Sequence, residues 1–163
     1  MYSKYIVLID NKVPLPSRAS IVNDAWGESI PVSFVQDAEV LNDASYLDLK
    51  VNKWEANGKW SEMQEQEPWI RVETYRDERV REFLDENQLR LTVNNKNCFL
   101  VALELDDGWQ EIDQVLLACV VKALVKIQNI YAYDDVKGYI DCGDYLKSLP
   151  SKESVRKSVF LEE

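Results

Sequence analysis

Four aspartates surround two glycines in the segment 134–144 and form a candidate site for a divalent cation. Hard cations such as Ca²⁺ and Mg²⁺ prefer carboxylate oxygens as ligands. The spacing differs from that of a calcium loop, because Val136 and Gly138 stand where an EF-hand loop carries ligands. A solvated turn is therefore the simpler interpretation of this group, whose members are Asp134, Asp135, Asp141 and Asp144.

Other residue types that commonly act in catalysis are either absent or not arranged in a known catalytic or metal-binding motif. The chain has no histidine, which excludes a Ser-His-Asp or Cys-His centre within it and zinc sites with imidazole ligands. The three cysteines, Cys98, Cys119 and Cys142, show no CxxC spacing. No phosphate-binding glycine motif and no GxSxG motif occurs. We therefore expect a protein without catalytic residues, metal or cofactor.

The charge of the chain is strongly acidic. Among 163 residues, 29 Asp and Glu face 19 Lys and Arg, a net charge of −10. This charge repels a phosphate backbone, so we expect no direct binding to nucleic acid. It favours a cationic protein partner, although it would equally keep a cytosolic protein soluble. No signal sequence or membrane span is recognisable, and we expect a cytoplasmic protein with no membrane contact.

Alternating apolar and polar residues predict strands over 46–54 and 69–76. In the second strand, one face carries Ile70, Val72 and Thr74, and the other carries Trp69, Arg71, Glu73 and Tyr75. Asn57-Gly58 predicts a type I′ hairpin turn between Trp54 and Trp60. Further strands are predicted over 5–9, 30–35, 89–93, 98–103, 129–133 and 139–142, with 89–93 paired to 98–103.

Helical periodicity and capping residues predict three main helices. They begin after Ser17, at Asp77 and at Trp109, the last after a capping-box-like spacing of Asp107 and Gln110. The fold expected is one α+β domain over 1–163, a mostly antiparallel sheet with helices on one face. Its main core helix is the long amphipathic one over 109–127. Residues 151–163 fit a docked helix or a frayed tail.

Acidic and aromatic side chains gather around the predicted hairpin and the following strand. Aromatic residues are enriched at protein interfaces, so this region is a candidate surface for a basic partner. Alternatively, the tryptophans cover a second, smaller hydrophobic layer. The candidate partner-binding residues are Trp60, Glu62, Glu65, Glu67, Trp69, Glu73, Asp134 and Asp135.

The segment from Trp109 to Asp144, an amphipathic helix followed by NIYAYDD and GYID, resembles bacterial immunity-protein families. These small acidic α+β cytosolic proteins neutralise polymorphic or contact-dependent toxins that competing cells deliver. The resemblance implies a non-catalytic inhibitor that binds a toxin, such as a cationic nuclease, and it assigns no individual residue. Two alternatives stay open: an enzyme that uses carboxylates with a divalent metal, and a structural or chaperone-like adaptor, such as a homodimer formed through an exposed edge strand.

Overall fold

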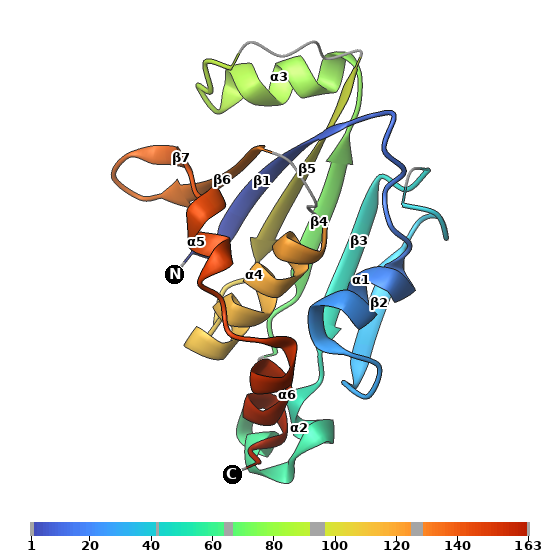
Figure 1. Cartoon of the computed structure of the whole chain (residues 1–163), viewed down its shortest axis with the longest axis vertical. Helices are drawn as coiled ribbons and strands as arrows, with labels where there is room; N and C mark the ends of the chain where they lie inside the picture. The colour runs from blue at the N-terminus through green and yellow to red at the C-terminus, as the bar shows by residue number, and fades with distance from the viewer. Residues whose placement is uncertain (1, 42, 64–66, 92–96, 125–128, 163) are drawn as a thin grey trace.

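The chain folds into a seven-stranded sheet with helices on both sides (Figure 1). The structure, a computed structural model, describes residues 2–41, 43–63, 67–91, 97–124 and 129–162. The strands are β1 (Lys4–Asp10), β2 (Val32–Gln36), β3 (Tyr46–Val51), β4 (Ile70–Tyr75), β5 (Cys98–Leu105), β6 (Asn129–Asp134) and β7 (Gly138–Asp141). The helices are α1 (Arg18–Trp26), α2 (Lys53–Ala56), the 3₁₀ helix η1 (Gly58–Met63), α3 (Glu78–Glu86), α4 (Glu111–Leu124), α5 (Gly143–Lys147) and α6 (Lys152–Phe160).

The strands run in the order β2-β3-β4-β5-β1-β6-β7, and every neighbouring pair is antiparallel. This confirms the predicted α+β class. β1 lies inside the sheet, and Tyr5, Val7 and Ile9 point to one hydrophobic core while Ile6 and Leu8 point to another. The strand is therefore apolar on both faces, as a central strand covered on both sides must be.

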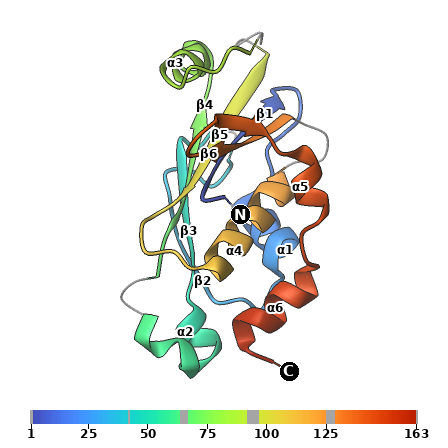
Figure 2. The ribbon, with the colours of Figure 1, turned by 90° about the vertical axis from the view of Figure 1, so that its left-hand side faces the viewer.

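Helices α1, α4 and α6 cover one face of the sheet (Figure 2). The buried indole of Trp26 in α1 donates a hydrogen bond to the Leu116 carbonyl of α4 over 3.1 Å. α4 confirms the predicted core helix but begins at Glu111. Its first turn is capped by Asp113, whose Oδ2 accepts from the Gln110 N–H at 2.8 Å, and Asp107 does not take this role. The predicted residues 125–127 lie outside the described residues.

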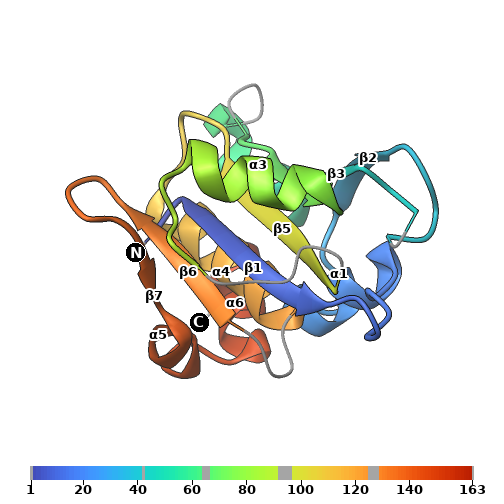
Figure 3. The ribbon, with the colours of Figure 1, turned by 90° about the horizontal axis from the view of Figure 1, so that it is seen from above.

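α3 departs from the expectation that the helices share one face. Its side chains Val80 and Leu84 pack on Ile6, Leu8 and Leu100, which point away from α4. Figure 3 shows α3 in front of the sheet and α4 on the far side of the sheet. The apolar stripe of α3 was correctly predicted. Because β1 is apolar on both faces, this stripe packs on a second hydrophobic core, on the side of the sheet opposite α4.

The predicted hairpin at Asn57-Gly58 is wrong. Asn57 has a φ of −153°, whereas a type I′ turn needs positive φ, and the segment forms α2 and η1 instead. Asn57 Nδ2 donates to the Phe160 carbonyl at 2.9 Å, and Trp60 Nε1 donates to the Val159 carbonyl at 2.7 Å. These bonds satisfy carbonyls at the C-terminal end of α6, which is docked and not frayed.

The predicted strand over 89–93 is also not found where the chain is described. Residues 89–91 form no strand, residues 92 and 93 lie outside the described residues, and β5 pairs with β1 and β4. Leu89 and Leu91 pack under α3, which accounts for their apolar character without a strand.

Gly27 ends α1 in a backbone conformation that L-residues rarely adopt, with φ 91° and ψ 169°. We predict that Gly27→Ala lowers the free energy of unfolding by about 1–3 kcal/mol in denaturant titrations. Gly58→Ala is the control, because Gly58 lacks a positive φ and a Cβ there would meet no atom within 4 Å. Equal losses from both substitutions would contradict this explanation.

Candidate functional site

The face of the sheet opposite α4 is only partly covered by α3. On β4, Ile70 and Val72 point to the helices, and the alternating residues Arg71 and Glu73 are exposed, as the sequence predicted. We call the uncovered surface the open face. It consists of Lys4, Asp48, Lys50, Trp69, Arg71, Glu73, Glu104, Tyr133 and Tyr139.

A row of alternating charges crosses the open face. Asp48, Arg71, Glu104 and Lys4 lie directly opposite one another on β3, β4, β5 and β1, and we call them the charge row. Arg71 Nη1 lies 2.7 Å from Asp48 Oδ2, and Lys4 Nζ lies 3.6 Å from Glu104 Oε1. Opposite charges in facing strand positions attract, so the row orders long side chains that would otherwise be mobile.

Arg71 is the most firmly held member of the charge row. Its Nε and Nη2 donate to the two carboxylate oxygens of Asp106 at 3.0 and 2.8 Å, while Nη1 donates to Asp48. A guanidinium that binds one carboxylate through two parallel bonds has its plane fixed as well as its position. The open face therefore presents Arg71 in a defined orientation.

Aromatic rings continue the row beyond Lys4. The Lys4 ammonium lies 5.3 Å from the centre of the Tyr133 ring on β6. Tyr133 faces Tyr139 on β7, with ring centres 5.2 Å apart in an edge-to-face arrangement. Rings and charges thus form one surface across six neighbouring strands, in the order β3, β4, β5, β1, β6 and β7.

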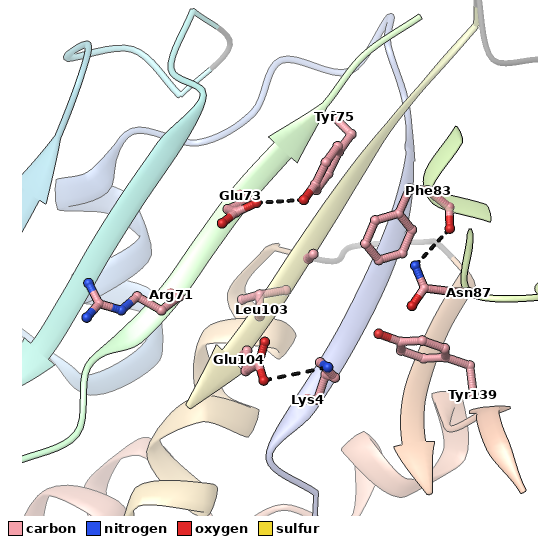
Figure 4. Close-up of a pocket in the computed structure, with 10 residues that line it drawn as sticks. Lys4, Arg71, Glu73, Tyr75, Phe83, Asn87, Leu103, Glu104 and Tyr139 are labelled. Carbon is pink, nitrogen blue, oxygen red and sulfur yellow. Dashed lines mark hydrogen bonds and ion pairs between the residues drawn. The ribbon is translucent and has the colours of Figure 1, made fainter. Parts of the chain in front are cut away.

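A pocket of about 220 Å³ lies where the open face meets α3, and we call it the α3 pocket (Figure 4). Glu73 and Tyr75 of β4 stand on one side, and Phe83, Asn87 and Tyr139 stand on the other. Ala102 lies between them, opposite Glu73 in the register, and its small side chain leaves the surface hollow at this point.

Hydrogen bonds and ring contacts fix the walls of the α3 pocket. The Tyr75 hydroxyl donates to Glu73 Oε2 at 2.6 Å, and the Tyr75 and Phe83 ring centres are 5.0 Å apart. Burial, together with the Glu73 carboxylate, raises the pKa of Tyr75 to about 12. Burial, together with Glu104, raises the pKa of Tyr139 to about 12. Both phenols therefore keep their protons at neutral pH, and Tyr75 donates its proton to Glu73.

A second group of charges is buried at one end of the sheet. Lys53 Nζ lies 2.6 Å from both Glu67 Oε2 and Asp113 Oδ1, and we call these three residues the Lys53 cluster. The side chains are 1%, 1% and 4% exposed. The Lys53 ammonium also lies 5.8 Å from the centre of the Trp60 ring. This cluster joins α2, the segment before β4 and the first turn of α4.

Glu67 was predicted as a surface contact, and its burial removes it from that surface. Its Oε1 atom is buried without a hydrogen-bond partner among the described residues. Burial raises the pKa of Glu67, while the bond to Lys53 acts in the opposite direction. Among the described residues, Lys53 is the cation paired with Glu67, and Glu67 shares it with Asp113. The charge of Glu67 is therefore incompletely compensated, and a raised pKa is the direction expected.

The structure does not gather the predicted partner-binding residues at one place. Trp69 and Glu73 lie on the open face. At its edge, Asp134 ends β6 and Asp135 begins the turn to β7. Trp60 and Glu62 belong to η1, beside α6, and Glu65 lies outside the described residues. Seven residues of the open face were not among the predicted partner-binding residues, although alternation had placed Arg71 on the polar face of its strand. They are Lys4, Asp48, Lys50, Arg71, Glu104, Tyr133 and Tyr139.

The other sequence candidates have local structural explanations. Asp134 Oδ1 accepts hydrogen bonds from the N–H groups of Val136 and Lys137 at 2.9 Å, which lower its pKa and close the turn. Within the described ranges, no group of three or more Cys, Asp or Glu is placed to hold a metal ion. Burial raises the pKa of Cys119 and Cys142 to about 11, so both remain thiols at neutral pH.

Comparison of the chain with protein-family models, curated proteins and solved structures gives no match. No helix in the described part of the chain has both the length and the apolar character needed to cross a lipid bilayer.

Replacing Lys53 tests the importance of the Lys53 cluster. We predict that Lys53→Met lowers the free energy of unfolding by about 3–5 kcal/mol, because two buried carboxylates lose their cation. The exposed Lys59→Met removes the same charge nearby and should change stability by less than about 0.5 kcal/mol. Urea titrations of both variants at pH 7 measure the difference, and a similar small effect from both would show that the cluster is dispensable.

The raised pKa of Glu67 predicts a pH dependence. The folded state holds this proton more tightly than the unfolded state, so the contribution of Glu67 to stability is complete below pH 4.5 and decreases as pH rises through its folded-state pKa. Glu67→Gln should abolish this component, so its stability relative to wild type should rise between pH 4.5 and 7. Urea titrations across this range check the result. The exposed Glu62→Gln should follow wild type, and parallel profiles for all three proteins would refute the assignment.

Proposed function

We propose that this chain is a non-catalytic binding protein that neutralises a toxin, and that the open face is its binding surface. The observation that carries the proposal is the charge row, which continues into Tyr133 and Tyr139 on neighbouring strands. Residues held on strands lose little freedom on binding, so such a surface can give affinity and specificity together.

The charge distribution supports a basic protein as the partner. The net charge of −10 accelerates encounter with a cationic molecule, whereas the alternating signs of the charge row select one orientation of the complex. Asp134 and Asp135 at the edge of the open face, with Trp69 and Glu73 on it, retain the partner-binding role expected from the sequence. The immunity-protein resemblance of 109–144 supplies the class of partner, a toxin domain.

A protection assay tests this function. If an adjacent upstream reading frame encodes a large secreted protein, its C-terminal domain is the toxin candidate, and this domain is expressed in a bacterial host with or without this protein. We predict that wild type restores growth. We also predict that Arg71→Glu weakens the purified complex by at least about tenfold in calorimetry, because two carboxylates lose their shared cation.

Arg156→Glu provides the matched control for this assay. Arg156 is exposed on α6, on the opposite side of the sheet from the open face, and the substitution changes the net charge equally. It should leave affinity within about twofold of wild type once ionic strength is raised to screen long-range charge. No growth rescue by wild type would contradict the function, and equal losses from the two variants would contradict the binding surface.

A further inference from the structure

We propose that the α3 pocket binds the guanidinium group of an arginine on the protein partner, with Glu73 as its counter-ion. This inference rests on the proposed function and deepens it, because it names the side chain that the open face recognises.

Glu73 is the acidic group that the fold leaves available in the α3 pocket. Its carboxylate accepts a hydrogen bond from the neutral Tyr75 hydroxyl, and it forms no ion pair among the described side chains. The two cations that line the pocket are engaged elsewhere, Arg71 with Asp48 and Asp106, and Lys4 with Glu104. The negative charge of Glu73 is thus held in position without a cation.

The surroundings of the α3 pocket are net acidic even when the nearest cations are counted. The lining carries two cations, Lys4 and Arg71, and two carboxylates, Glu73 and Glu104. The groups around it are Lys50 and Arg79 against Asp48, Glu86 and Asp106, which leaves an excess of one negative charge. An anionic ligand would meet this excess of negative charge. A cation is therefore the ligand that the local field favours.

The rings of the α3 pocket favour a guanidinium over an ammonium ion. Tyr75, Phe83 and Tyr139 surround the space beside Glu73 (Figure 4). A guanidinium can bind a carboxylate through its planar edge while its face stacks on an aromatic ring, and it is more weakly hydrated than an ammonium. The chain itself uses this contact, since the Arg79 guanidinium lies 4.8 Å from the centre of the Tyr75 ring and that of Arg18 lies 3.5 Å from the centre of the Phe34 ring.

The position of the α3 pocket fits an arginine that projects from a protein and docks on the open face. Arg71, Glu104 and Lys4 belong both to the pocket lining and to the charge row. A partner that covers the charge row therefore reaches the pocket without a change in the backbone of this chain.

Short blocked peptides test the α3 pocket without the partner. Acetyl-Gly-Arg-Gly-amide is titrated into the ¹⁵N-labelled full chain, with the citrulline and lysine peptides as comparisons. We expect the arginine peptide to shift the amide signals of residues 73, 102 and 139, and the neutral citrulline peptide to bind at least about tenfold more weakly. Absence of shifts at these residues, or equal affinities for the arginine and lysine peptides, would overturn the proposal.

Two variants distinguish binding in the α3 pocket from an effect of net charge. Glu73→Gln should weaken arginine-peptide binding about tenfold, whereas the exposed Glu153→Gln on α6 makes the same change in net charge and should leave it unchanged. Ala102→Leu fills the α3 pocket without changing charge and should also abolish the shifts, with its amide spectrum reporting whether it is folded. Equal effects of Glu73→Gln and Glu153→Gln would refute the site.

The peptide experiment tests the pocket assignment, and the toxin experiment tests the proposed function, so either can be contradicted without the other. If the peptides do not bind but wild type still rescues growth and Arg71→Glu still weakens the complex, the pocket assignment is wrong and the proposed function stands. If the arginine peptide binds in the α3 pocket but no toxin is neutralised, the proposed function is wrong and the pocket remains a guanidinium site.

Discussion

The buried ammonium of Lys53 constrains how one end of this molecule is assembled. A cation with almost no exposure requires nearby anions, and Glu67 and Asp113 reach it from two other parts of the chain. Asp113 also caps α4, so the same carboxylate fixes the helix start and the ion pair. The Trp60 ring contacts the Lys53 ammonium, and its Nε1 donates a hydrogen bond to the Val159 carbonyl. Trp60 thereby links the Lys53 cluster to α6.

Local signals in the sequence were sufficient where side chains alternate on a half-buried strand or repeat on a helix. The pattern from Ile70 to Tyr75 predicted both faces of β4, and Ser17 and Gly27 predicted the ends of α1. Local signals failed where a distant group competes. Asn57 is a residue type common in hairpin turns, but its side-chain amide donates a hydrogen bond to the Phe160 carbonyl at the end of α6. No pattern in the neighbouring sequence predicts this distant partner.

The candidate site was harder to predict than the fold, because it depends on register. Alternation placed Arg71 and Glu73 on the polar face of β4, but nothing local indicates that Asp48 and Glu104 lie beside Arg71. Lys4, which belongs to the same row, is separated from Glu104 by most of the chain. Glu67 shows the reverse difficulty, since an acidic residue in an acidic stretch looks exposed until its pairing with Lys53 is known.

The position of β1 inside the sheet affects how the chain folds. β1 is the first strand in the sequence, yet its two neighbours, β5 and β6, begin at Cys98 and Asn129. During synthesis, β1 therefore remains without its partner strands, and its apolar side chains remain exposed, until β5 and β6 have left the ribosome. Pairing between such distant segments closes large loops, so folding of this chain is expected to be slow relative to helical proteins of its size. Until then β1 exposes apolar surface that favours aggregation.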